Sequence, residues 1–473
     1  MSLLDHPDAQ ALLADATLSP AAVDGGRDRL TAFLRRYLPH FSRLEQRAHA
    51  GTVLRGRLSG LERQTCEPIA SQAGRHRKTI QTFVGQGAWD DDAVLAELRQ
   101  HVRDELADPQ AIVILDSSGS VKKGAASCGV ARQWCGRLGK VDNCQLGLFL
   151  AYAAPHGCAP VDRRLDLPED WAADAERRLA THVPEEVVFQ ESWRIAADLL
   201  RRHASLPHAW VVGDDDFGRA SAFRRLLRQR GEPYVLDVPC DTTIRDLERR
   251  RPPRRRAGVG RKRQVPSCRV DIWAARQPAA RRARFTVRDG EKGPLEVEAM
   301  TVRVRAKQER RIGPEERLLV VRTVEAKPQT SYSLSDAAPD VPLSELVRVH
   351  GTRPRIEELF ESGQGDAGLA HYEVRSWVGW HHHVRLSLLA LWFLGLERRQ
   401  LGGENPGRDG VAGAADLQPL VTGPGLDGGA DRRGGHAGAA PERGVADRPL
   451  VCDHPYLPPT ARGLIRVKLL RLR

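Results

Sequence analysis

The chain has 473 residues, which is too long for one ordinary hydrophobic core and suggests roughly two to four domains. Lysine and arginine outnumber aspartate and glutamate by 73 to 61, and the resulting charge of +12 suits a polyanionic partner such as nucleic acid. The most apolar stretch, around residues 386–396, is about half as long as a bilayer requires, so no membrane contact is expected. The N-terminus shows no signal-peptide pattern, and we expect a cytoplasmic protein.

The eight cysteines form no Cys-x-x-Cys pair. This spacing predicts neither a zinc ribbon nor a disulfide framework, and we expect reduced, mostly buried thiols.

Residues 1–107 have a helical pattern, with apolar side chains at i, i+3, i+4 and i+7 from Leu30 to Tyr37. A basic turn before a short helix contains Arg75, Arg77 and Lys78. Arginine side chains and the backbone N–H groups of a helix start both favour phosphate, so we interpret this segment as a helical DNA-binding region. An ordinary solvated helix end would have the same composition.

Residues 111–115 form an apolar run, three of them β-branched, that is followed directly by Asp116 and a Ser/Gly stretch. The pattern predicts a buried strand that ends at a carboxylate, although aspartate also opens ordinary turns. Residues 208–213 repeat the pattern and are followed by Asp214. Asp215 and Asp216, which come next, have the alternative role of capping the following helix.

Between residues 108 and 240 we predict three strands, a helix, a strand, a helix and a strand, with an acid closing the first and fourth strands. This order is the one expected for an α/β fold with an RNase H-like mixed-sheet core.

Residues 241–342 read as an inserted β-rich subdomain with a basic loop, because alternating apolar and polar residues follow a strongly basic block. The block from Arg249 to Arg263 contains nine Lys or Arg residues and no acid. It is the best DNA-binding candidate in this part, although basic runs are often solvated loops. The candidate side chains are Arg254, Arg255, Arg256, Arg261, Lys262 and Arg263.

Helical periodicity returns in residues 343–399, which we predict to be a helical core segment. Residues 400–473 are rich in glycine and proline, and 13 of the 43 glycines fall within 401–450. We therefore expect a low-complexity tail without a packed core.

The sequence resembles the bacterial insertion-sequence transposases of the DDE superfamily, in the group whose third acid lies in a Tyr-Arg-Glu-Lys signature after a β insertion. The resemblance extends from roughly Arg27 to Arg399. Its most specific blocks are 129–136 (GVARQWCG), 165–171 (LDLPEDW), 213–218 (GDDDFG) and 372–377 (YEVRSW).

The resemblance places the catalytic acids of the family on Asp116, Asp214 and Glu357, with the last of these in the helical segment. The signature Tyr-x2-Arg-x3-Glu-x6-Lys falls on His350, Arg353, Glu357 and Gln364. The resemblance implies DNA contacts from His350, Arg353 and Gln364, but the first and last depart from the signature. A neutral amide at 364 weakens a phosphate contact that a lysine usually makes. Glu358 is the alternative third acid.

Three acids supply the hard oxygen ligands that Mg²⁺ or Mn²⁺ requires, and two such ions activate the nucleophile and stabilise the leaving oxygen. The resemblance implies that Asp116 bridges two ions while Asp214 and Glu357 each hold one. It also implies that a homodimer in the bacterial nucleoid binds double-stranded DNA, both the terminal inverted repeats and the target. The reaction implied is cleavage at the element ends followed by strand transfer.

Two other functions stay open from the sequence. One is a DNA nuclease that shares the core but performs no strand transfer, and the other is an inactive DNA-binding remnant, suggested by Gln364 and the unusual tail. The consecutive histidines 381–383 are not expected to bind metal, because successive helical residues point about 100° apart. Trp273 and Trp377 are more often core residues than base-stacking ones.

Overall fold

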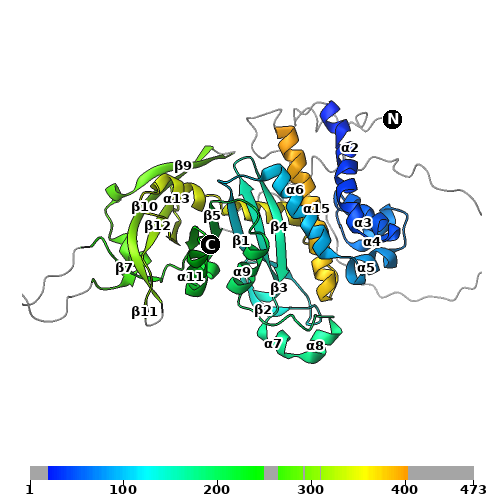
Figure 1. Ribbon diagram of the computed structural model, residues 1–473, viewed down its shortest axis with the longest axis horizontal. Coiled ribbons are helices and arrows are strands. Elements are labelled where there is room, and N and C mark those ends of the chain that lie inside the picture. Colours follow the sequence, from blue (N-terminus) through cyan, green and yellow to red (C-terminus); the bar gives the residue numbers. More distant parts are fainter. Residues whose placement is uncertain (1–19, 250–264, 291–292, 309–310, 403–473) are drawn as a thin grey trace, which may run out of the picture. The chain divides into compact units, whose positions relative to one another are not determined.

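The structure is a computed structural model that describes residues 20–249, 265–290, 293–308 and 311–402. These residues form a mixed α/β fold built on one large mixed sheet with helices packed against it (Figure 1), which confirms the predicted fold class. All six candidate DNA-binding side chains of the basic block, from Arg254 to Arg263, lie outside the described residues, as does nearly all of the predicted tail.

The chain begins with helices, as the apolar periodicity predicts. They are α2 (Pro20–Tyr37), the 3-10 turn η2 (Leu38–His40), α3 (Leu44–Arg57), α4 (Cys66–Gln72), α5 (Arg77–Gln86) and α6 (Asp91–Leu106). The start of α6 is fixed by Asp90, whose carboxylate accepts hydrogen bonds from the backbone N–H groups of Asp92 and Ala93 at 2.9 and 3.1 Å.

Five strands form the central part of the sheet in the spatial order β4-β3-β1-β5-β6. Their bounds are β1 (Ile112–Val121), β3 (Lys140–Ala154), β4 (Gly157–Leu165), β5 (Trp210–Gly213) and β6 (Tyr234–Asp237), and a short β2 (Ala131–Cys135) pairs with β3. Strand β1 is antiparallel to β3 and parallel to β5, and β5 is parallel to β6. This arrangement is the mixed pattern expected of an RNase H-like core.

Two details of the strand prediction were wrong. Strand β1 does not end at Asp116 but continues to Val121, because the small residues after Asp116 pair with β3 as far as Cys144. Strand β4 was missed, and it rather than the short β2 is the third strand of the core. The helices between these strands are α7 (Glu169–Ala173), α8 (Ala175–Ala180), α9 (Ser192–Arg202), α10 (Asp215–Arg219) and α11 (Ser221–Arg230).

The β-rich segment extends the core sheet instead of forming a sheet of its own, because β13 pairs with β6. Its elements are β7 (Thr243–Asp246), β8 (Cys268–Arg269), α12 (Val270–Ala275), η3 (Ala279–Arg281), β9 (Ala283–Gly290), β10 (Gly293–Gln308), β11 (Arg311–Ile312), β12 (Glu316–Thr323) and β13 (Thr330–Ser335). It has an apolar cluster of its own, which includes Trp273. The indole Nε1 of Trp273 donates to Asp246 at 2.8 Å, so this tryptophan is a core residue.

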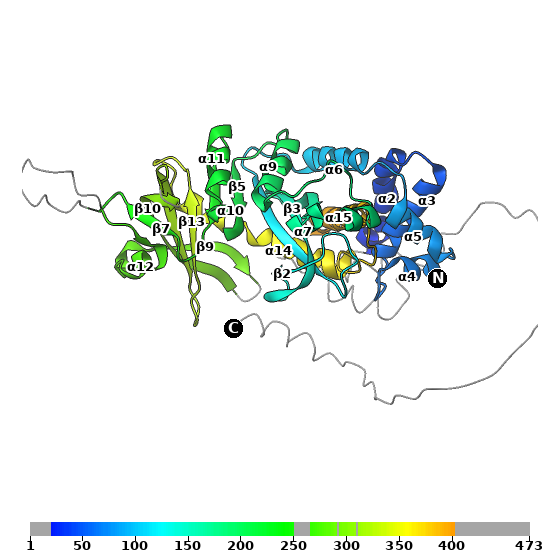
Figure 2. The same ribbon diagram turned by 90° about the horizontal axis from the view of Figure 1, so that it is seen from below.

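The described chain ends in three helices, α13 (Leu343–His350), α14 (Pro354–Asp366) and α15 (Trp377–Gly402). Helix α15 is buried on nearly all sides, because it packs against β4 on one side and against α3, α5 and α6 on the other (Figures 1 and 2). Trp377 is buried at its start and lies against His381, in agreement with a packing role. In the described part of the chain, no helix is long and apolar enough to cross a membrane.

A buried ion network connects α15 to the sheet and to the N-terminal helices. Arg385 of α15 is fully buried, and its guanidinium lies 3.0 Å from Asp91 of α6 and 3.5 Å from Asp162 of β4. Arg163 of β4 donates to the same Asp91 at 2.6 Å and to the carbonyl of His381 at 2.8 Å. Three segments that are distant in sequence therefore share one set of charges.

Removing Arg385 should destabilise the protein strongly, because the fully buried Asp162 and the partly buried Asp91 would lose a counter-ion. We expect Arg385→Ala to lower the free energy of unfolding by about 3–5 kcal/mol in urea titration. The matched control is Arg399→Ala on the same helix, where a partly exposed pair with Glu105 should contribute less than about 1 kcal/mol. Equal losses in the two variants would contradict the role of the buried network.

Candidate active site

Three aspartates follow matching positions of three adjacent parallel strands. Leu115 of β1 pairs with Gly213 of β5, and Gly213 pairs with Leu236 of β6. The next residues are Asp116, Asp214 and Asp237. Because neighbouring strands lie about 4.8 Å apart, this register gathers three carboxyl groups at one edge of the parallel strands.

Asp116 is the most deeply buried member of the sequence-predicted acids, with 7% of its surface exposed. Burial raises the pKa of its carboxyl to about 7, and the nearby Asp214 and Glu357 contribute to the rise. Arg353 and the backbone N–H of Ser117, which donates to the carboxylate at 2.7 Å, partly oppose it. Asp116 therefore holds a proton near neutral pH when no cation is present.

Asp214 begins helix α10 as its capping residue and accepts a hydrogen bond from the backbone N–H of Asp216 at 3.0 Å. Burial raises the pKa of Asp214 to about 6, and the carboxylates of Asp216 and Asp215 add to this effect. We had expected Asp215 and Asp216 to cap a later helix. They instead occupy the first turn of α10, where both pair with Arg219.

Helix α10 approaches β6 closely because Gly218 has no side chain. A Cβ atom at this position would lie 1.8 Å from the carbonyl oxygen of Asp237, which no substitution could relieve without moving the backbone. This contact keeps the start of α10, and with it Asp214, next to the end of β6.

Arg353 is the cation that faces this group of acids. Its Nε lies 3.3 Å from Asp237 and its Nη1 lies 3.1 Å from Glu357. Burial alone would lower the pKa of Arg353, but the charges of Asp237, Glu357, Asp116 and Asp214 outweigh it and raise the pKa. One guanidinium thus compensates four carboxyl groups.

Glu357 lies in the first turn of α14, and about half of its side chain is exposed. It points toward Arg353 and contributes to the electrostatic environment of Asp116. The alternative acid, Glu358, is turned away and pairs with Arg288 of β9. The structure therefore brings Asp116, Asp214 and Glu357 into electrostatic contact and leaves Glu358 outside this group.

Asp237 was not predicted as a site residue. Burial tends to raise its pKa, but His350, Arg353 and Ser333 outweigh burial and hold the pKa below its usual range. The Nδ1 atom of His350 lies 3.3 Å from Asp237, so the largely buried His350 contacts one of the acids. An available signal was overlooked, because Asp237 closes an apolar strand in the same way as Asp116 and Asp214.

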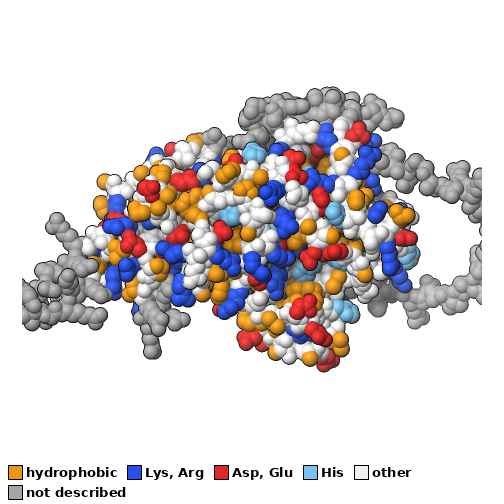
Figure 3. All heavy atoms as spheres, in the orientation of Figure 1, with side chains coloured by type: hydrophobic (Ala, Val, Ile, Leu, Met, Phe, Trp, Pro, Cys, Tyr) orange, Lys and Arg blue, Asp and Glu red, His pale blue; other side chains and the backbone are white. Residues whose placement is uncertain are grey.

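The remaining predicted DNA-binding residues lie at two other places. Arg75 precedes α5 and Lys78 lies in its first turn, and both are exposed. Arg77, the first residue of α5, pairs with Glu67 at 3.2 Å. Gln364 lies on α14 two turns beyond Glu357 and lines a small pocket next to β1. Figure 3 shows many Lys and Arg side chains on one face of the molecule, with Asp and Glu among them.

The donor chemistry of the site fits a divalent cation. The available donors are carboxylate oxygens, which Mg²⁺ and Mn²⁺ prefer. Burial raises the pKa values of Asp116 and Asp214, and Arg353 only partly opposes this rise. Within the described residues, no three His, Cys, Asp or Glu side chains converge as they would around a bound metal. Glu357 is paired with Arg353 instead, and about half of its side chain is exposed.

The histidines 381–383 each contact a different partner. His381 contacts the carbonyl of Trp377, His382 stacks on Trp89, and His383 contacts Arg57. Burial lowers the pKa of His381 to about 3 and that of His382 to about 4, so both are neutral packing residues at physiological pH.

A comparison with protein families gives a match to the family described as "DDE superfamily endonuclease" over residues 36–294. This range is more than half of the chain. The chain belongs to the DDE superfamily of endonucleases. The match includes Asp116 and Asp214 of this superfamily member and ends before Glu357.

Among solved structures, this DDE superfamily member is similar to a chain in the cryo-EM structure of the piggyBac transposase synaptic complex with hairpin DNA. The two chains are 8% identical, the TM-score is 0.40, and the similarity covers 80% of this chain and 70% of the other. A comparison with curated proteins gives no match.

The raised pKa of Asp116 predicts a specific dependence of stability on pH. The folded protein holds this proton up to pH about 7, whereas an unfolded aspartate loses it near pH 4, so the metal-free protein loses stability as the pH rises between these values. We expect Asp116→Asn to stabilise the protein in EDTA at pH 8 by on the order of 2–4 kcal/mol, and to have little effect at pH 4.

Thermal unfolding checks this expectation. Addition of Mg²⁺ at pH 8 should raise the Tm of the original protein more than that of the variant, because the cation compensates the buried negative charge of Asp116. Glu358→Gln is the control and should change neither response. The same Tm for Asp116→Asn and the original protein at pH 8 would mean that burial does not raise the pKa of Asp116.

Proposed function

We propose that the chain is a DDE transposase that binds the DNA ends of its own element, cuts them and joins them to target DNA with the help of divalent cations. The observation that carries the proposal is the register of β1 and β5, which puts Asp116 beside Asp214 within electrostatic range of Glu357. Membership of the DDE superfamily of endonucleases supports it, because two carboxylates and a third acid are what metal-dependent phosphoryl transfer requires.

In this proposal Asp116, Asp214 and Glu357 hold two Mg²⁺ or Mn²⁺ ions. The bound ions supply Lewis-acid stabilisation of the leaving oxygen and lower the pKa of the attacking water or 3′-OH. Asp116 gives up its proton when the cations bind, because its pKa of about 7 results from burial and a bound cation would stabilise the charged carboxylate. Glu357 is positioned by α14, and half of its side chain already faces solvent.

Arg353 acts as a positioning residue for Glu357 and as a counter-charge for the acids that remain. Asp237 holds its guanidinium from the side of β6. Asp237 is in turn contacted by His350, and Ser333 of β13 donates a hydrogen bond to it at 2.6 Å. The β-rich segment thus contributes directly to the support of the active site. Because Arg353 is anchored independently of Glu357, the glutamate can turn without releasing the arginine.

The partners and setting belong to the same proposal. We infer double-stranded DNA as substrate, with terminal inverted repeats and target DNA bound by a homodimer in a synaptic complex. We also propose a bacterial insertion-sequence origin, a place in the nucleoid and a division into the five segments 1–107, 108–240, 241–342, 343–399 and 400–473.

A second candidate function is a nuclease that cuts DNA without joining it. The family description favours it, because the words name an endonuclease and the matched residues end before Glu357. The two functions share the first chemical step and differ in the fate of the freed 3′-OH.

Metal-dependent cleavage should depend on the assigned acids. With a supercoiled plasmid and Mg²⁺ or Mn²⁺, we expect Asp116→Ala and Glu357→Gln to reduce the rate by more than the roughly 10–100-fold typical of losing an outer-shell partner. Glu358→Gln is the matched control and should retain activity within about threefold, because its partner is Arg288 at the surface. Equal cleavage by the original protein and Asp116→Ala would exclude this site.

Strand transfer separates the two candidate functions. The protein is incubated with Mg²⁺, a labelled duplex carrying the sequence that borders its gene and an unlabelled plasmid. A transposase should yield label covalently joined to the plasmid, whereas a nuclease should yield cut duplex alone. Cleavage without joined product would overturn the transposase proposal and leave the metal site intact.

A further inference from the structure

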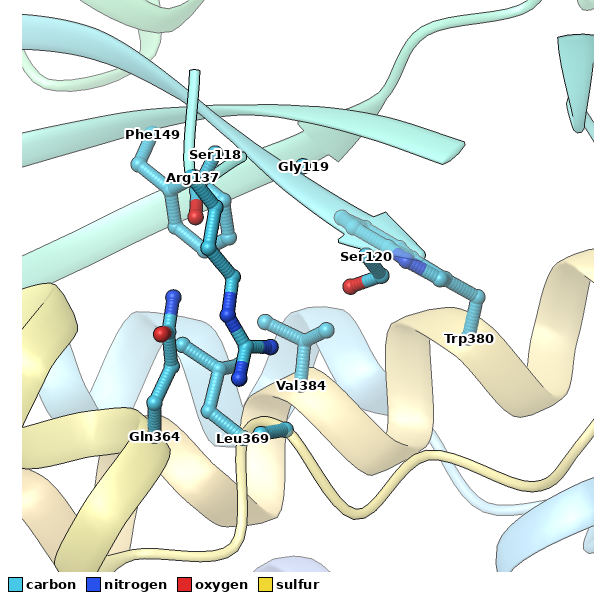
Figure 4. A pocket seen from close by; sticks show the side chains of 10 residues that line it. Ser118, Gly119, Ser120, Arg137, Phe149, Gln364, Leu369, Trp380 and Val384 are labelled. Atoms are coloured by element: carbon cyan, nitrogen blue, oxygen red, sulfur yellow. The ribbon is translucent and has the colours of Figure 1, made fainter. Parts of the chain in front are cut away.

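A small pocket beside the acids has the composition of an anion site. It lies between β1, the turn after β2, and helices α14 and α15 (Figure 4). Its polar side chains are Ser118, Ser120, Arg137 and Gln364, and no carboxylate lines it. The rest of the lining is Gly119, Phe149, Leu369, Ala370, Trp380 and Val384.

The polar groups of this pocket have no partners within the described part of the protein. Arg137 forms no ion pair there, and the amide of Gln364 and the hydroxyls of Ser118 and Ser120 form no side-chain hydrogen bond. Figure 4 shows the Arg137 side chain extending across the pocket toward the helices, with the Gln364 amide beside it. The pocket is therefore lined by four side chains that can donate hydrogen bonds, of which only Arg137 carries a positive charge.

The local backbone holds Arg137 in this position. Gly119 of β1 has no side chain, and a Cβ atom there would lie 2.8 Å from the Sγ atom of Cys135 at the end of β2. The close approach brings the turn after Cys135 against β1. The backbone N–H groups of Leu138 and Gly139 donate to the carbonyl of Cys135 at 2.9 and 3.0 Å, which closes the turn that carries Arg137.

The pocket continues the line of the catalytic acids. Ser118 and Ser120 follow Asp116 at alternate positions of β1, so they lie on the same face, about 7 and 13 Å further along the strand. Gln364 follows Glu357 by two helical turns, which is about 10 Å along α14 and returns to the same face of the helix. A DNA strand that passes Asp116 and Glu357 in this direction must run over the pocket.

We propose that this pocket binds a backbone phosphate of the substrate strand, with Arg137 as its cation and Gln364, Ser118 and Ser120 as neutral donors. The proposal rests on the proposed function, because it takes the acids as the cutting site. At about 3.4 Å of rise per nucleotide, the bound phosphate lies roughly two to four nucleotides from the scissile bond. Arg137 supplies from the turn after β2 the charge that Gln364 does not supply from α14.

The experiment measures binding of the full chain to a fluorescent 30-base-pair duplex in EDTA over a range of salt concentrations. Arg137→Ala should weaken binding about tenfold and reduce the slope of log affinity against log salt by about 0.9, as expected for one lost phosphate contact. Arg137→Lys should keep the slope and lose part of the affinity, because lysine keeps the charge without the bidentate geometry.

Two further variants make the assignment specific. Arg225→Ala removes another exposed arginine, on α11, that does not line the pocket, and it should leave slope and affinity unchanged. Gln364→Lys, introduced into Arg137→Ala, should restore both quantities, because a cation returns to the same pocket from the other side. Unchanged binding by Arg137→Ala, equal losses in the two alanine variants, or no rescue by Gln364→Lys would each overturn the proposal.

Failure of this proposal is distinguishable from failure of the proposed function. Binding is measured in EDTA and needs no catalysis, whereas cleavage depends on Asp116. If Asp116→Ala abolishes cleavage while Arg137→Ala binds DNA normally, the proposed active site stands and the proposed phosphate site is wrong.

Discussion

The organisation of this protein depends on the mutual repulsion of carboxyl groups that the sheet forces together. The register of β1, β5 and β6 places Asp116, Asp214 and Asp237 in one row, and α14 adds Glu357. Arg353 is shared among all four groups. Burial, with a further contribution from neighbouring carboxylates, raises the pKa values of Asp116 and Asp214, and the site is suited to bind further positive charge.

The surrounding structure maintains this unfavourable arrangement. Helix α15 and its buried Arg385 connect the N-terminal helices to β4, while β13 joins the β-rich segment to β6 at the edge where Asp237 lies. Packing of this kind allows local electrostatic strain to persist, as is common where a protein binds or transforms a ligand. The β-rich segment therefore supports the site through Ser333, and its role extends beyond lengthening the sheet.

Local sequence patterns were sufficient for the fold class and for two of the aspartates, because apolar strands that end in acid are visible without any tertiary information. The same patterns concealed three features. The small residues after Asp116 looked like a turn, yet they pair with β3 and extend β1. Asp237 was not predicted as a site residue, because its relation to Arg353 depends on the register of β6. Arg137 was not noticed, since only folding brings the turn after β2 next to α14.

The central claim is that Asp116, Asp214 and Glu357 bind divalent cations together, and anomalous diffraction from crystals of the protein grown with Mn²⁺ and a duplex DNA tests it most directly. The account predicts an anomalous peak bound by the carboxylates of Asp116 and Asp214, with Glu357 turned away from Arg353 toward the metal. Well-ordered carboxylates with no peak between them, and Glu357 still paired with Arg353, would contradict it.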